Sequence, residues 1–185
     1  VLKDKNVDYI FMGHAEERID DFLSTVLKHD IKKLSGLQGV GYRDESGKII
    51  VNRVTTFLSD VKEHIKLDYS LVDIKPYLDQ DNNNYQLNSR VPSATVITSY
   101  GCPYNCIFCA SRTITGRKVV FRPIEDVLKE IEYLINKYNV QSLLFLDDCF
   151  LLDKKRIEKF LNEMIKRKYN LRWKIATVSA WHLDD

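Results

Sequence analysis

The sequence predicts an α/β fold whose C-terminal half contains a parallel sheet. Strand-like runs and helix-like stripes alternate from residue 94 onward, and the run at 142–146 is continuously apolar after Ser142. A continuously apolar run suits a parallel strand that is buried on both faces. The order strand, helix, strand, helix, strand is the one that right-handed βαβ crossovers produce, and it fits a closed (β/α) barrel and an open sheet equally well.

A smaller unit is predicted for residues 1–60. The apolar run 7–12 ends at Gly13 and predicts a strand. A helix should follow, because the next apolar residues repeat at helical spacing and carboxylates occupy the first turn. The segments 40–42 and 49–51 flank Glu45-Ser46-Gly47, which is typical of a hairpin turn.

The best candidate for a linker is the stretch 61–90. Apolar periodicity fades there, and Asp81-Asn82-Asn83-Asn84 is a cluster of polar turn-forming residues. The sequence therefore predicts a second domain over residues 91–185.

The second domain should begin with a strand at 94–98, which Gly101-Cys102-Pro103 ends. Pro123 suits the first turn of a helix, and an apolar stripe runs from there to Tyr138. Asp153 is a candidate N-cap for a helix over 154–168, and residues 171–178 predict a third strand.

Charge and hydropathy argue against several classes of protein. The 28 basic and 26 acidic residues give a net charge of +2 and are interspersed, so no electrostatic footprint for nucleic acid appears. The apolar stretches are far shorter than the ~20 residues of a membrane span, and residues 1–6 lack the apolar core of a signal peptide. We expect a cytoplasmic protein. The chain starts without methionine and stops after an apparent strand, so we expect a fragment that is inactive alone.

Three of the four cysteines lie within eight residues, as Cys102-x-x-x-Cys106-x-x-Cys109. Thiols stay reduced in the cytosol, where such clusters usually bind metal. Three thiolates on one loop can hold an iron-sulfur cluster and leave one iron open for a ligand. The alternative is a structural zinc site with Cys149 or a histidine as fourth ligand. A lone cysteine such as Cys149 is more often a small buried hydrophobe.

The segment Gly101-Cys102-Pro103-Tyr104-Asn105-Cys106-Ile107-Phe108-Cys109 resembles the signature of the radical S-adenosylmethionine (SAM) superfamily. The resemblance implies that Cys102, Cys106 and Cys109 bind a 4Fe-4S cluster and that Phe108 packs near the adenine of SAM. It implies a partial (β/α) TIM-like barrel with the cluster at its top. It also implies reductive cleavage of SAM to a 5'-deoxyadenosyl radical, a small-molecule substrate, and an electron donor such as flavodoxin or ferredoxin.

Asp147 and Asp148 follow the second strand of the domain, at the end where barrel enzymes carry their active-site groups. In the radical SAM superfamily, residues at this place contact the methionine amino group or the ribose, and a carboxylate suits both. The alternative is that they cap the next turn. Arg122 is a weaker candidate, because an arginine before a helix is usually exposed and solvated.

Residues 8–16 resemble the end of the Rossmann-like cobalamin-binding domain that precedes many of these barrels, with Gly13-His14-Ala15-Glu16 where a Gly-Glu-Gly-Glu run is usual. Phe121-Arg122-Pro123, Asp147-Asp148-x-Phe150 and Trp173 extend the resemblance to the cobalamin-dependent subgroup. It implies bound cobalamin and methyl transfer to an unactivated carbon or phosphorus. The alternatives are a methylthiotransferase or oxidoreductase without cobalamin, and a zinc-binding module. A lone histidine such as His14 is more often a turn residue.

Overall fold

The computed structural model describes residues 1–59, 61, 67–78 and 91–178. The chain divides into two compact units. The N-terminal unit comprises residues 1–65 together with 102–118, and the C-terminal unit comprises residues 66–101 and 119–185. The cysteine loop therefore groups with the N-terminal unit although both of its ends continue into the C-terminal one.

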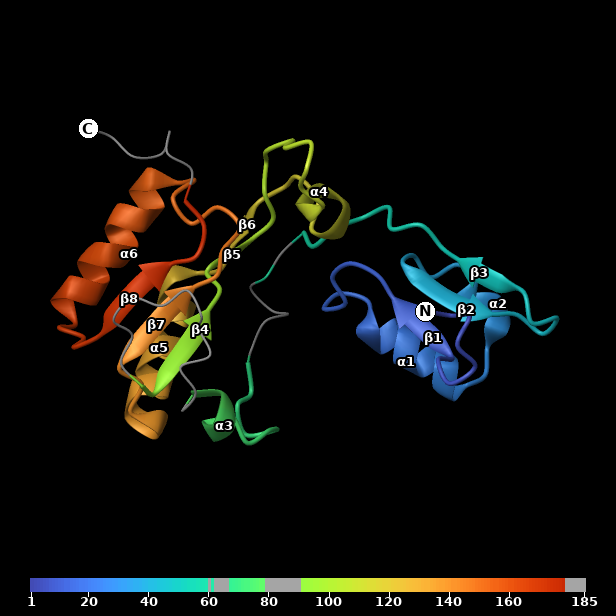
Figure 1. Ribbon diagram of the computed structural model, residues 1–185, viewed down its shortest axis with the longest axis horizontal. Helices are drawn as coiled ribbons and strands as arrows, with labels where there is room; N and C mark the ends of the chain where they lie inside the picture. Colours follow the sequence, from blue (N-terminus) through green and yellow to red (C-terminus); the bar gives the residue numbers. More distant parts are fainter. Residues whose placement is uncertain (60, 62–66, 79–90, 179–185) are drawn as a thin grey trace. The chain divides into compact units, whose positions relative to one another are not determined.

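Among the described residues, the N-terminal unit has one antiparallel sheet in the order β1-β2-β3 (Figure 1). Its elements are β1 (Tyr9–Phe11), α1 (Ile19–Leu27), α2 (Ile31–Leu34), β2 (Val40–Arg43) and β3 (Ile49–Val51). Leu34, Val40 and Tyr42 are buried in its core. The predicted strand, helix and hairpin are confirmed. The Rossmann-like assignment of this unit stays a prediction, since parallel pairing does not occur among its described strands.

The hairpin turn between β2 and β3 is stabilised by Asp44. Its carboxylate accepts hydrogen bonds from the backbone N–H of Ser46 (2.9 Å) and of Lys48 (3.0 Å). Gly47 has φ +81°, a left-handed conformation that glycine adopts without steric cost. The hydrogen bonds of Ser46 and Lys48 lower the pKa of the Asp44 carboxyl, with the Ser46 hydroxyl making the largest contribution.

The C-terminal unit contains a parallel sheet, as predicted. In the described part, its order is β4-β7-β8, formed by β4 (Ser93–Val96), β7 (Ser142–Phe145) and β8 (Arg172–Ile175). Helix α5 (Ile124–Tyr138) connects β4 to β7 and helix α6 (Lys154–Lys166) connects β7 to β8. Because three strands are described, closure into a partial barrel stays a prediction.

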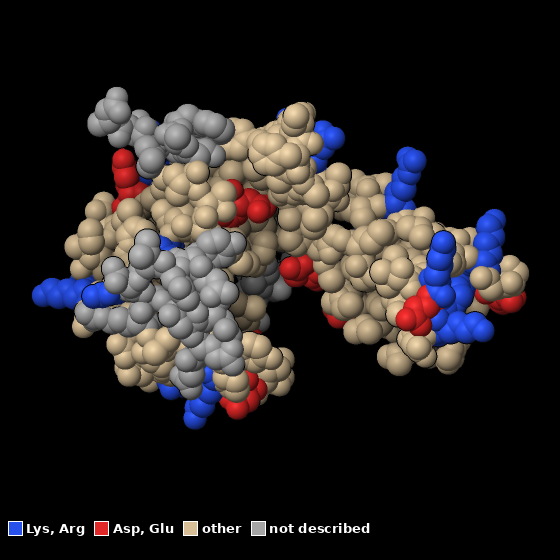
Figure 2. All heavy atoms as spheres, viewed as in Figure 1, with Lys and Arg blue, Asp and Glu red and all other residues tan. Residues whose placement is uncertain are grey.

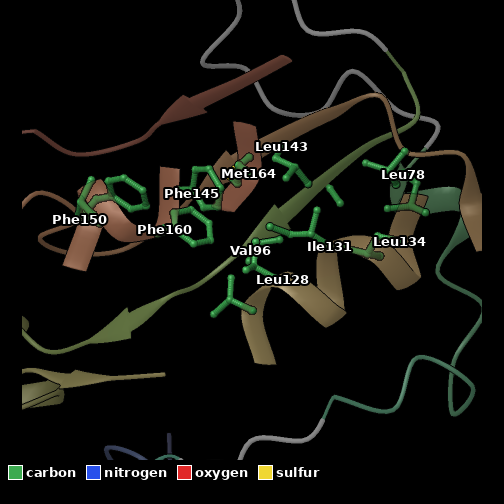
Figure 3. Packing of buried hydrophobic residues seen from close by; sticks show 14 of the residues in the cluster. Leu78, Val96, Leu128, Ile131, Leu134, Leu143, Phe145, Phe150, Phe160 and Met164 are labelled. Atoms are coloured by element: carbon green, nitrogen blue, oxygen red, sulfur yellow. The ribbon is translucent and has the colours of Figure 1, made fainter. Parts of the chain in front are cut away.

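The core of this unit lies between the sheet and the two helices (Figure 3). Phe145 of β7 is fully buried, and its ring lies 4.9 Å from that of Phe150 and 5.6 Å from that of Phe160. Both helices begin where the sequence indicates. Pro123 is the N-cap of α5, and the carboxylate of Asp153 accepts a hydrogen bond from the backbone N–H of Arg156 (3.0 Å) at the start of α6.

Part of the predicted linker contributes to this core. Helix α3 (Lys75–Leu78) lies within 61–90, and Ile74 and Leu78 are buried against the core of the C-terminal unit. The polar cluster 81–84 is outside the described residues. The domain boundaries drawn from the sequence stay a prediction.

Two short strands were not predicted. β5 (Ser99–Tyr100) and β6 (Val120–Phe121) pair antiparallel, with Ser99 opposite Phe121 and Tyr100 opposite Val120. The chain leaves β5 for the cysteine loop, passes through the short helix α4 (Ser111–Ile114), and returns by β6. The loop therefore begins and ends at one two-stranded ladder.

Basic and acidic side chains lie intermixed on the face shown in Figure 2. Within the described ranges, no helix is both long and apolar enough to cross a membrane.

Candidate functional site

Two of the three cysteines of the cysteine loop are exposed. Cys106 and Cys109 are exposed and Cys102 is half-buried, and none of the four cysteines, all of which lie in the described ranges, forms a disulfide. The backbone N–H of Cys109 donates to the carbonyl of Cys106 (3.1 Å), and the backbone N–H of Ser111 donates to the sulfur of Cys109 (3.4 Å). Phe108 is 89% exposed between the last two cysteines. Three thiols and one aromatic ring are thus accessible on a single loop.

The donor set of the loop fits an iron-sulfur cluster. Cysteine thiolates are the usual protein ligands of such clusters. The segment 102–118 also carries Arg112, Arg117 and Lys118 but no carboxylate. Among the described residues, no three histidine, cysteine or acidic side chains are gathered closely enough to hold a metal ion. The fit therefore rests on ligand type and accessibility.

Cys149, the fourth ligand of the zinc alternative, is 5% exposed in the C-terminal unit. Its burial is what the sequence indicates for a small hydrophobe.

The returning limb of the cysteine loop packs against residues 57–59. Gly116 has φ +79°, and a Cβ atom at this position would lie 2.6 Å from a ring carbon of Phe57. The ammonium of Lys118 donates to the carbonyl of Ser59 (3.1 Å). Only glycine fits at this contact, since a side chain would require both a strained backbone and displacement of the Phe57 ring.

In the N-terminal unit, Arg18 holds the turn that follows β1. Its guanidinium donates to the carbonyl groups of Met12 (3.0 Å), His14 and Gln38 (2.6 Å). His14 lies in this turn, as predicted, with its Nδ1 atom 3.5 Å from a carboxylate oxygen of Glu16. Sequence reasoning missed Arg18, because its acceptors are backbone groups that leave no residue pattern.

Asp147 and Asp148 have opposite environments. Asp147 is 1% exposed and Asp148 is exposed, as is Leu146. The Asp147 carboxylate accepts hydrogen bonds from the backbone N–H of Thr98 (3.0 and 3.1 Å to its two oxygens), the Thr98 hydroxyl (2.7 Å) and the Ser99 hydroxyl (2.6 Å). Contact of either carboxylate with SAM stays a prediction, but the protein itself already supplies donors to Asp147.

The half-buried Arg156 of α6 completes this polar cluster, and the sequence did not reveal it. Its guanidinium donates to the Thr98 hydroxyl (3.2 Å), the Thr98 carbonyl (3.0 Å) and the Arg122 carbonyl (3.0 Å). It also lies 4.9 Å from the ring centroid of Phe121. Burial lowers the pKa of Arg156, and the charge of Asp147 opposes that shift.

The expectation that Arg122 is exposed is wrong. Its side chain is 5% exposed, forms an ion pair with Glu130 (2.6 Å) and donates to the carbonyl of Ile97 (2.7 Å). The hydroxyl of Tyr69 donates to the other oxygen of Glu130 (2.5 Å). Burial and the Glu130 carboxylate raise the pKa of Tyr69 above its usual range. Arg122 thus ties the end of β4 to α5.

Residues 96–182 match the sequence model of the Radical SAM superfamily. Over these residues the chain is similar to the radical SAM superfamily. The matched residues of the radical SAM domain include the cysteine loop, β7 and α6.

Three similar proteins extend this finding. An uncharacterized methyltransferase of Pyrococcus horikoshii is 29% identical over 81% of this chain and 30% of its own length. An anaerobic magnesium-protoporphyrin IX monomethyl ester cyclase of Rubrivivax gelatinosus is 26% identical over 92% of this chain and 29% of its own length. The solved structure of OxsB, a cobalamin-dependent SAM radical enzyme with aqua-cobalamin and SAM bound, has a TM-score of 0.63 and 26% identity. That match covers 89% of this chain and 22% of OxsB. The chain thus spans less than a third of each of these proteins.

Proposed function

We propose that the whole protein is a radical SAM enzyme that transfers a methyl group with the help of cobalamin. One observation carries this proposal: an exposed loop with three cysteines follows the first strand of a parallel α/β sheet, inside a radical SAM domain. The methyltransferase of P. horikoshii and the cobalamin-bound OxsB structure support the reaction and the second cofactor. The target is a small molecule with an unactivated carbon or phosphorus centre.

In this proposal Cys102, Cys106 and Cys109 hold a 4Fe-4S cluster with one iron open for SAM. The cluster, when bound, supplies the electron that splits SAM into methionine and a 5'-deoxyadenosyl radical. Phe108 offers an exposed aromatic face for the adenine. The exposed carboxylate of Asp148 can accept charge-assisted hydrogen bonds from the methionine ammonium.

We further propose that residues 1–60 end a Rossmann-like cobalamin-binding domain and that residues 91–185 begin a partial (β/α) barrel, with 61–90 as their linker. An electron donor such as flavodoxin or ferredoxin delivers the electron. A cytoplasmic location would keep the clustered thiols reduced.

A radical SAM cyclase or other oxidoreductase is the second candidate. The match to the magnesium-protoporphyrin cyclase of R. gelatinosus, over 92% of this chain, favours it. Product analysis separates the two, because only methyl transfer adds one carbon to the substrate.

The test is anaerobic purification of the full-length protein, followed by quantitation of iron, sulfide, zinc and corrinoid. We expect a brown protein with about four irons per chain and one corrinoid. Cys106→Ala should abolish iron binding, whereas the matched variant Cys149→Ala should keep it. A colourless protein with one tightly bound zinc per chain would contradict the proposal.

A further inference from the structure

We propose that Asp147 is a positioning residue that fixes the direction in which the chain enters the cysteine loop, and that Arg156 fixes the point where the loop returns. This inference deepens the proposed function and rests on it. It assigns Asp147 a role through Thr98 and Ser99 instead of a direct contact with SAM.

The entry to the loop is held by Asp147. Thr98 and Ser99 are 0% and 3% exposed, and they directly precede the Tyr100-Gly101-Cys102 segment. The carboxylate of Asp147 receives the backbone N–H and the hydroxyl of Thr98 and the hydroxyl of Ser99. Three donors on one buried carboxylate fix both the backbone and the side chains at this point.

Arg156 links the entry of the loop to its exit. One of its nitrogens donates both to the Thr98 carbonyl and to the Arg122 carbonyl, each at 3.0 Å. A direct backbone hydrogen bond from Arg122 N–H to the Thr98 carbonyl (2.9 Å) joins the same two residues. The antiparallel pairing of Ser99 with Phe121 follows directly after this hydrogen bond. The two ends of the loop are therefore held at a fixed separation.

Charge makes this arrangement sensitive to small changes. Asp147 is buried and Arg156 is half-buried, and both depend on the Thr98 hydroxyl, which donates to the Asp147 carboxylate and accepts from the Arg156 guanidinium. Loss of the Thr98 hydroxyl removes a donor from Asp147 and an acceptor from Arg156. The expected response is a shift of residues 98–101, and with it of the first cysteine.

A direct contact of Asp147 with SAM fits the geometry less well. The Asp147 oxygens already receive four short contacts from Thr98 and Ser99, and the side chain is 1% exposed. An exposed carboxylate, Asp148, is next in the chain. A positioning role and a direct contact with SAM predict different effects for a change at Thr98. The side chain of Thr98 is itself fully buried.

The experiment compares Thr98→Val with Thr98→Ser in the reconstituted full-length protein. Valine keeps the shape of threonine but lacks its hydroxyl, whereas serine keeps the hydroxyl. The measurements are iron content, the dissociation constant for SAM, and the change that SAM produces in the electron paramagnetic resonance spectrum of the reduced cluster. Groups that do not touch the metal but orient its ligands usually contribute 10- to 100-fold to metal affinity or to activity. We expect Thr98→Val to retain iron, to weaken SAM binding roughly 10-fold or more, and to alter the SAM-induced spectral change. Thr98→Ser should be close to the wild type.

Ser99→Ala provides a second, milder variant if Thr98→Val fails to fold, since it removes only the 2.6 Å hydrogen bond to Asp147. A lowered melting temperature with unchanged SAM affinity and spectrum in these variants would overturn the positioning role. So would loss of SAM affinity in Asp147→Asn without any loss in Thr98→Val and Ser99→Ala, which would indicate direct contact. A wild-type protein that binds no cluster would refute the proposed function itself, and the inference with it.

Discussion

Replacement of Glu130 by glutamine should destabilise the C-terminal unit strongly. Glu130 and Arg122 form an ion pair at 2.6 Å, with side chains 7% and 5% exposed. At this distance the attraction is about 6 kcal/mol for an effective dielectric constant near 20. The desolvation of two ions costs several kcal/mol each, so the pair as a whole contributes little net stability.

Removal of one partner has a different outcome, because the other charge stays buried. Glu130→Gln leaves Arg122 without its carboxylate and close enough to Arg156 for the two guanidinium charges to repel. We expect a loss of about 3–5 kcal/mol in the free energy of unfolding. The double variant Arg122→Met/Glu130→Gln removes the uncompensated charge. Its loss should be only about 1–3 kcal/mol, mainly because the carbonyl of Ile97 loses a donor.

The assay is hydrogen exchange of the full-length protein, followed by mass spectrometry of peptides from α5. Its buried turns, around Val127, Ile131 and Leu134, should contain the slowest amides and report the opening free energy of this unit. If the double variant were as unstable as Glu130→Gln, or if Glu130→Gln cost less than about 1 kcal/mol, the pair would behave as a solvated surface contact. Our account of a buried, charge-balanced cluster would then be refuted.

Two further outcomes are expected. Asp148→Asn should weaken SAM binding by roughly 1.5–3 kcal/mol in a titration of the reconstituted protein, while iron content stays unchanged; equal affinity would exclude a SAM contact. A hydrogen bond from Tyr169, and to a smaller extent one from Arg167, lowers the pKa of the Glu132 carboxyl. These hydrogen bonds therefore stabilise the fold at pH values above the ordinary glutamate pKa of 4.5. The stabilisation is lost as the pH falls through the lowered pKa. Melting temperatures measured down this acid range should therefore fall less steeply for Glu132→Gln than for the wild type, and parallel curves would argue against the assignment.

The long periodic elements were predictable from the sequence because their apolar side chains are the ones that become buried. In α5, Val127, Leu128, Ile131 and Leu134 form the apolar stripe, and all four are buried. The continuous apolar run of β7 likewise indicates a parallel strand, and all of its residues are buried. The backbone hydrogen bonds of such elements form within the helix or along an extended strand pairing. The pattern of apolar side chains is therefore enough to predict them.

The elements that sequence reasoning missed depend on partners distant in the chain. β5 and β6 have two residues each, too few for any periodicity, and they exist because Arg122 and Thr98 join them. Arg122 can be buried because Glu130 of α5 forms an ion pair with it. Helix α3 was missed because it has four residues, too few for a clear stripe, and Ile74 and Leu78 anchor its segment to the core. These pairings come from tertiary structure and leave no local pattern.

Asp147 and Asp148 differ because of the helix layer beside β7. Both are carboxylates after the same strand, and the sequence alone treats them alike. Successive side chains of an extended chain point to opposite faces, so only one of the two can share the buried side of Phe145. That residue is Asp147, while Asp148 lies with the exposed Leu146. A buried carboxylate is stable only if donors meet it, and Thr98 and Ser99 supply them there. The apolar register of β7 therefore decides which carboxylate is buried against Thr98 and Ser99 and which is exposed.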